Sequence, residues 1–168
     1  MPPSDPLVRL LSVLQPSLQM YLADSGIWSY PGDEELKLAL ADVVGDQRSL
    51  VERAAVALEH RGVTVSPPAY PITFTSCHDV DIRSLVPRVI EGLKDQLAAC
   101  DAIVESTGDD PDGVFAKGLV REARATSQRH LDVLRQVADA ERLRRAAHRP
   151  ANASGSPASP PASPTPAS

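Results

Sequence analysis

Apolar residues recur at three- and four-residue spacing in four long segments of the chain, which places them on one face of an α-helix in each segment. The connections near 25–32 and 106–111 are short, so the helices that they join should be antiparallel neighbours. The sequence therefore predicts an all-α fold, an antiparallel four-helix bundle. The expected helices span about 5–23, 33–61, 77–105 and 111–147.

The connection between the second and third helices, residues 62–75, is much longer than the other two. At up to about 3.3 Å per extended residue it can cross roughly 45 Å, the length of a whole helix. Tyr70, Ile72 and Phe74 alternate along it, so we expect an extended strap whose apolar side chains pack on the bundle. One long crossover in the middle makes the second and third helices parallel, as in a ferritin-like bundle.

Capping residues and prolines set the expected helix ends. Asp5–Pro6 and Asp110–Pro111 each place an N-cap before a proline at the first helical position. Ser76–Asp79 fits a capping box and predicts the start of the third helix. Pro16 and Pro87 lie inside apolar-periodic runs. We expect Pro16 to kink the first helix without dividing it, because the apolar stripe keeps its phase, and Pro87 to kink or divide the third.

Composition indicates one helical domain, residues 1–149, followed by a tail. The chain has 168 residues, of which 42% are hydrophobic and only 4% aromatic, so aliphatic side chains must fill the core. Residues 150–168 are mostly Pro, Ala and Ser, without a charge or a large apolar side chain, which predicts disorder. A net charge of −5 and few aromatic residues argue against nucleic acid as a partner.

The first residues and the cysteines bear on location. Met1–Arg9 lacks a basic leader, and polar residues and Pro16 interrupt the apolar run that follows. We therefore expect no signal peptide, no membrane span and a cytoplasmic protein. Cys77 and Cys100, if both lie on the third helix, are separated by about 35 Å, which is far too long for a disulfide. They should be reduced thiols.

Polar residues fall on the four expected inner faces near mid-bundle: Gln19 or Gln15, Gln47, Gln96 and His130. Neutral amides bind metals weakly, whereas a buried Gln can fix helix register by pairing across the core. We predict that Gln19, Gln47 and His130 form a polar seam in the core. The expected partner of His130 is Gln19, Gln47 or a buried water, with a role as metal ligand as the alternative.

A di-iron bundle would need about four carboxylates and two histidines, including Glu-x-x-His on two helices. The sequence offers only fragments of this pattern. Ser127 stands where a Glu should precede His130, and Ser49 stands where a His should follow Asp46. We therefore expect no bound metal and no other cofactor.

Four segments together resemble the ferritin-like superfamily of small bacterial bundle proteins, over about residues 5–140: Leu18–Leu22, Asp46–Leu50, Pro71–Asp79 and His130–Leu131. The resemblance implies a four-helix fold with a left-handed long crossover. In active relatives it also implies a metal-centred oxidase or an iron-handling role.

Two functions follow. The preferred one is a non-enzymatic ferritin-like bundle that acts as a binding or scaffold protein for an unidentified protein partner, with a homodimer left open. No catalytic residue is assigned, since neither GxSxG nor a phosphate-binding loop occurs. The alternative is a metal-binding ferritin-like oxidase or iron-handling protein, with di-iron or manganese on an irregular ligand set. That set would comprise Asp46, Glu122 and His130, with Glu91 as a further candidate. The number of carboxylates near His130 discriminates between them.

Overall fold

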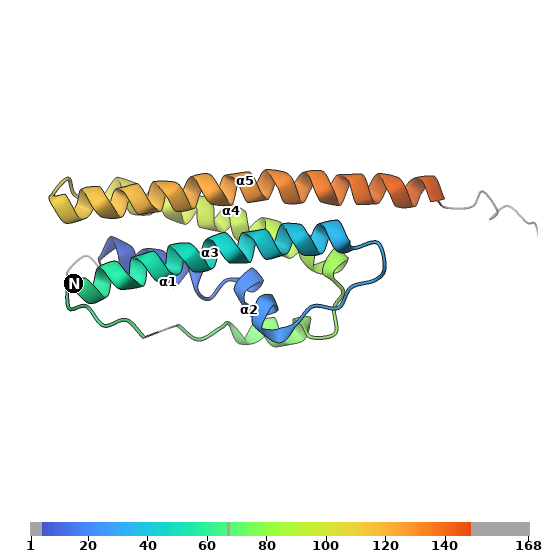
Figure 1. Ribbon diagram of the computed structural model, residues 1–168, viewed down its shortest axis with the longest axis horizontal. Coiled ribbons are helices and arrows are strands. Elements are labelled where there is room, and N and C mark those ends of the chain that lie inside the picture. The colour runs from blue at the N-terminus through green and yellow to red at the C-terminus, as the bar shows by residue number, and fades with distance from the viewer. Residues whose placement is uncertain (1–4, 67, 149–168) are drawn as a thin grey trace, which may run out of the picture.

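The computed structural model describes residues 5–66 and 68–148 (Figure 1). Within these residues the chain forms helices and one isolated β-bridge, but no strand. The all-α prediction is confirmed, whereas the predicted tail, 150–168, lies outside the described residues. The helices are α1 (Pro6–Leu14), α2 (Leu18–Ser25), α3 (Glu34–His60), the 3₁₀ helix η1 (Ile72–Cys77), α4 (Ile82–Ser106) and α5 (Pro111–His148).

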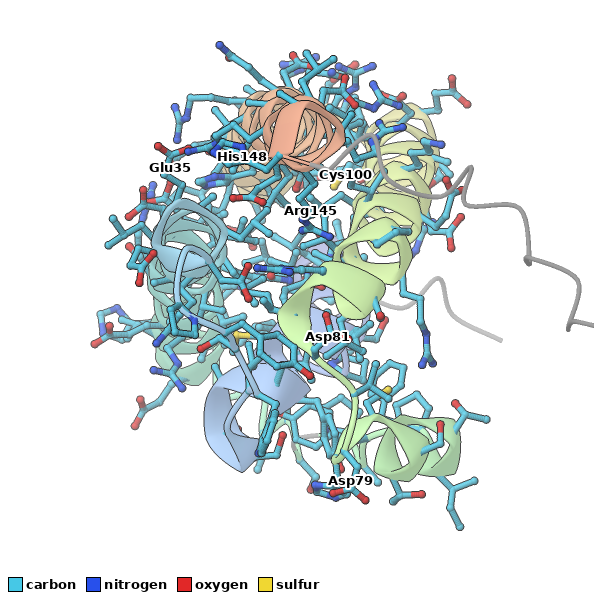
Figure 2. The ribbon with its side chains drawn as sticks, turned by 90° about the vertical axis from the view of Figure 1, so that its right-hand side faces the viewer. Glu35, Asp79, Asp81, Cys100, Arg145 and His148 are labelled. Carbon is cyan, nitrogen blue, oxygen red and sulfur yellow. The ribbon has the colours of Figure 1, made fainter. Side chains whose placement is uncertain are left out.

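The three long helices pack side by side, and α5 runs antiparallel to both α3 and α4 (Figure 1). Viewed along the bundle, α2 and η1 lie on the side away from α5 (Figure 2). Because α3 and α4 both oppose α5, they run in the same direction, as the long crossover predicts. Polar side-chain contacts show the register of α5: Glu35–Arg144, Asp46–His130 and Arg53–Glu122 with α3, and Asp101–Arg124 with α4.

The core consists of two clusters of buried aliphatic side chains, one toward each end of the bundle. The first cluster joins α2 to the N-terminal parts of α3 and α4 and to the C-terminal half of α5, for example through Leu22 and Leu134. The second cluster joins α1 to the opposite ends of the long helices, for example through Leu10 and Leu58. Buried polar side chains occupy the level between the clusters: Gln19, Gln47, Gln96, Ser127 and His130.

The predicted single helix over 5–23 is two helices, so the expected kink at Pro16 is a break. Helix α1 ends at Leu14, and Ser17 adopts an extended backbone (φ −76°, ψ 154°) before α2 begins. Pro16 cannot donate a backbone hydrogen bond and crowds the preceding turn. Leu18 remains buried after the break. The apolar stripe therefore kept its phase although the helix did not continue.

The third long helix begins later than predicted. Asp81 is the N-cap of α4, and its carboxylate accepts hydrogen bonds from the backbone N–H of Arg83 (3.0 Å) and Ser84 (3.2 Å). The predicted capping box at Ser76–Asp79 therefore does not start this helix. Pro87 lies inside α4, which stays undivided. Only one helical hydrogen bond is lost there, because proline removes a single N–H donor.

The crossover is only partly the extended strap that alternation predicts. Its end coils into η1, and the ring centroids of Tyr70 and Phe74 lie 5.3 Å and 5.6 Å from that of Tyr21 on α2. Ile72, in contrast, is 83% exposed. The 3₁₀ turn replaces the two-residue period of a strand with a three-residue period, which turns Ile72 outward.

Candidate functional site

Gln19 and Gln47, two residues of the predicted polar seam, lie beside the break between α1 and α2. Gln19 Nε2 donates to Gln47 Oε1 over 2.9 Å, so the two glutamines pair across the core. Gln47 Nε2 in turn donates to the carbonyl of Leu14 (3.0 Å) and to Ser17 Oγ (3.2 Å). Leu14 is the last residue of α1, and the final carbonyls of a helix lack partners within the helix. Gln47 thus satisfies one of them.

This network also fixes how the Gln19 amide is oriented. Gln47 donates both of its hydrogen bonds through Nε2, so the Gln47 side-chain oxygen must face Gln19. Gln19 must therefore contact that oxygen with its own side-chain nitrogen. Gln19 Oε1 is left as a buried acceptor without a hydrogen-bond partner among the described residues. The side chain of Gln19 is 0% exposed.

His130 is buried on α5 and makes a different contact from those predicted. Its Nε2 hydrogen-bonds to Asp46 Oδ2 over 2.8 Å instead of to Gln19 or Gln47, and Arg129 donates to the same carboxylate oxygen over 2.9 Å. The hydrogen bond from His130 is the main cause that lowers the pKa of Asp46, and Arg129 adds to it. Asp46 is half-exposed, so the pair closes the seam toward solvent.

The residues of the alternative metal site are brought together only in part. Asp46 and His130 meet, but Glu122 lies eight residues before His130 on α5, about 12 Å along the axis. Both Glu122 oxygens accept hydrogen bonds from Arg53, at 2.6 Å and 2.8 Å. Glu91 is exposed on α4 and pairs with Lys94. Across residues 5–66 and 68–148, no three His, Cys, Asp or Glu side chains are placed to hold one metal ion.

A groove of about 580 Å³ lies beside the seam, between the α1–α2 break, η1 and α4. Val13, Leu18 and Phe74 form apolar parts of its wall, and Gln19 and Gln96 also line it. Gln96 is only 4% exposed, and both atoms of its amide lack a partner within the described part of the chain. A second cavity, of about 10 Å³, touches Gln96 from the other side; Gln47, Ser127 and His130 also line it.

The sequence pointed to Gln96 as an inward polar residue but did not reveal the groove. The usable signal was the spacing of Gly92, Gln96 and Ala99, which places two very small residues beside one amide on the same face of α4. Such a face cannot fill the space opposite it unless a neighbouring helix comes close. In the structure the groove lies between this face of α4 and the α1–α2 break.

Both cysteines are free, as predicted, and both are buried. They lie on different elements and not on one helix, Cys77 in η1 and Cys100 in α4. Burial, and secondarily the nearby charge of Asp101, raises the pKa of the Cys100 thiol to about 11. Arg88 Nη1 lies 2.9 Å from Cys77 Sγ. A thiol with so high a pKa stays protonated at neutral pH, so Cys100 is a poor nucleophile.

Comparison of the chain with protein-family models, with curated proteins and with solved structures finds no match. The resemblance to the ferritin-like superfamily therefore stays a prediction. In the part of the chain that the structure covers, no helix is both long and apolar enough to cross a membrane.

Proposed function

We propose that this chain is a non-enzymatic, ferritin-like bundle that acts as a binding or scaffold protein and has no functional di-metal centre. The observation that carries the proposal is that the polar side chains of the seam already hydrogen-bond to groups of the protein. Gln19 and Gln47 bond to each other and to the end of α1, and His130 bonds to a carboxylate that also holds Arg129.

The direction of the helices supports the ferritin-like part of the proposal. Helices α3 and α4 run parallel, and one long connection leads from His60 at the end of α3 to Ile82 at the start of α4 (Figure 1), the topology of a bundle with one crossover. Together, α1 and α2 take the place of the first helix.

Charge balance supports the metal-free part. Two divalent ions in a bundle core need several anionic ligands, because burying uncompensated charge is very costly. Among the buried or half-buried residues of the seam, only Asp46 carries a carboxylate, and Arg129 already neutralises part of its charge. Ser127 is buried where a di-iron protein would need a Glu.

One observation favours the alternative, a metal-binding oxidase or iron-handling protein. Asp46 Oδ2 and His130 Nε2 lie 2.8 Å apart, so two atoms of the kinds that bind iron or manganese are already close together. For Glu122 to join them as a ligand of di-iron or manganese, it must leave Arg53 and cross two helical turns.

Metal content tests the proposal. Protein produced in medium supplemented with iron and manganese should contain far less than one equivalent of either metal after purification without a chelator. Near-stoichiometric iron or manganese, lost in the His130→Ala variant and kept in a variant of an exposed histidine such as His60→Ala, would contradict it.

A further inference from the structure

We propose that the proline-rich tail of this chain, residues 156–166, docks on the end of the bundle where α3 and α4 begin and α5 ends. The docking surface consists of a groove between α4 and α5, here called the α4–α5 groove, and of two exposed aromatic rings beside it, Trp28 and Tyr30. The inference goes beyond the proposed function, since it does not depend on whether the polar seam binds metal.

The α4–α5 groove has a volume of about 520 Å³ and lies between the first half of α4 and the last turns of α5. Pro87 is exposed, and Ile90 and Ala138 are half-buried, so these three residues present apolar surface that an occupant can reach. Figure 2 looks onto this end of the bundle, where Arg145 and His148 of α5 are labelled. The groove is therefore open at the end of the helix from which the tail continues.

The charges in the α4–α5 groove favour an uncharged occupant. Each of the five charged residues that the structure places along it already has a partner of opposite charge: Arg83 with Asp33, Glu91 with Lys94, Arg142 with Asp139, and Glu141 with Arg145. A charged ligand would have to displace one of these pairs and would lose part of its own hydration. An uncharged, apolar chain segment avoids both costs.

Two aromatic rings extend this surface. The ring centroids of Trp28 and Tyr30 lie 6.0 Å apart, edge to face, and the two residues are 64% and 49% exposed. Their backbone is fixed, because the N–H of Ile82 donates to the carbonyl of Trp28 and the N–H of Tyr30 donates to Asp33 Oδ2, each over 2.8 Å. The guanidinium carbon of Arg83, which lines the groove, lies 5.4 Å from the centroid of the Tyr30 ring. Exposed aromatic rings held in place are the kind of surface that binds proline-rich segments.

The occupant is inferred from where the tail begins and from its sequence. Helix α5 ends at His148, three residues after Arg145, which lines the groove, so the tail begins beside this surface. Residues 157–164 read Pro-Ala-Ser-Pro-Pro-Ala-Ser-Pro, which is uncharged and repeats the Pro-x-x-Pro spacing. In a polyproline II helix, with three residues per turn, the two prolines of each repeat lie on one side. At about 3.1 Å per residue, residues 149–156 can span about 25 Å, enough to carry the repeats along the groove.

The covalent link between the tail and α5 makes a weak contact sufficient. A segment without large apolar side chains cannot fold by itself, but it can bind to a surface that is already formed. The proline rings restrict the free segment and so reduce the entropy that it loses on binding. A short flexible linker gives an effective concentration on the order of millimolar at the surface. Docking within one molecule is therefore favoured over docking between two molecules at lower protein concentrations.

Fluorescence of the full chain tests the proposal, because Trp28 is its only tryptophan. In the wild type, Trp28 should emit at shorter wavelength and be quenched less by acrylamide than in a variant that replaces the four prolines of the repeats: Pro157→Ser, Pro160→Ser, Pro161→Ser and Pro164→Ser. The control variant, Ala151→Ser with Ala153→Ser, changes the tail outside the repeats and should behave like the wild type. Identical emission and quenching in the wild type and the four-proline variant would overturn the proposal.

NMR relaxation tests the same contact from the side of the tail. The ¹⁵N–¹H NOE of the Ala162 backbone amide should be positive in the wild type and fall in Trp28→Ser, because a released segment moves faster on the picosecond to nanosecond time scale. Phe115→Ser removes a ring that is 53% exposed near the start of α5, at the opposite end of the bundle, and should leave the NOE unchanged. Unfolding curves confirm that each variant is folded. Equal NOE values in the wild type and Trp28→Ser, or a wild-type NOE that falls on dilution because two molecules exchange tails, would contradict docking within one molecule.

Discussion

Gln47 on α3 donates its side-chain N–H to the backbone carbonyl of Leu14, the last residue of α1, over 3.0 Å. The same side chain accepts the amide N–H of Gln19 at the start of α2. One glutamine therefore bonds to both helices that flank the break at Pro16. A helix end in the core needs such a partner, because its carbonyls are cut off from water.

Replacing Gln47 with Leu should be strongly destabilising. The variant leaves the Leu14 carbonyl and Gln19 Nε2 buried without partners, at about 1–3 kcal/mol each, so we expect the free energy of unfolding to fall by about 2–6 kcal/mol. Urea denaturation followed by circular dichroism measures it. Gln136→Leu, at an exposed position of α5, is the matched control and should change stability little. Equal effects of the two substitutions would show that the bonds of Gln47 do not hold the break.

Replacing Gln96 with Leu should stabilise the protein, whereas replacing Gln47 destabilises it. Its amide is buried and lacks hydrogen bonds within residues 5–66 and 68–148, so the substitution removes an uncompensated polar group at nearly constant volume. We expect a gain of about 1–3 kcal/mol in the free energy of unfolding. The same urea series provides the measurement. A loss as large as that of Gln47→Leu would mean that Gln96 is hydrogen-bonded in solution.

The Asp46 carboxylate should make the free energy of unfolding depend on pH in the acidic range. Its pKa is lowered by the hydrogen bond from His130 and, to a lesser extent, by Arg129. A lowered pKa in the folded state gives stability that is present above the unfolded pKa, about 3.9, and is lost as pH falls through the folded value. Because Asp46 is half-exposed, the effect is modest.

The corresponding experiment compares Asp46→Asn with wild type in unfolding titrations from about pH 5 downward, the range in which an Asp titrates. Below about pH 4, the free energy of unfolding should decline less steeply with falling pH in the variant than in the wild type. Asp42→Asn, at an exposed acid one turn earlier on α3, serves as the control. Identical pH profiles for Asp46→Asn and wild type would remove Asp46 as a contributor.

The two thiols should be protected in the folded protein. Cys100 is 0% exposed and its pKa is raised to about 11 by burial, and Cys77 is 2% exposed. We expect a disulfide reagent such as DTNB to react with neither at pH 7.5 on the time scale of minutes, and with both in urea. Rapid reaction of one thiol in the native protein would show that its element opens locally.

Local patterns in the sequence were sufficient to predict the helical class and to place Gln19 and Gln47 on inner helix faces, where both are buried. They could not locate the start of α4, because both Ser76–Asp79 and Asp81 offer capping groups. A long-range contact accompanies the observed start, since the backbone N–H of Ile82 donates to the carbonyl of Trp28 over 2.8 Å. Such a contact is invisible to local capping rules.

The partner of His130 was missed for a related reason. Asp46 adjoins Gln47 in the sequence, but only the register of α5 against α3 brings Asp46 to the imidazole. The break at Pro16 was also ambiguous, because an apolar stripe that keeps its phase fits either a kink or a short interruption. The groove depends on that break, so it could not be anticipated.

We propose that the polar seam of this bundle binds no pair of metal ions. Calorimetric titration of the metal-free protein with ferrous iron under anaerobic conditions tests this proposal most directly. We predict no saturable binding in the wild type and the same baseline for His130→Ala, whose only effect should be a small loss of stability, about 1 kcal/mol, from the lost bond to Asp46. Two equivalents of iron bound tightly by the wild type, with the binding abolished by His130→Ala, would contradict the account.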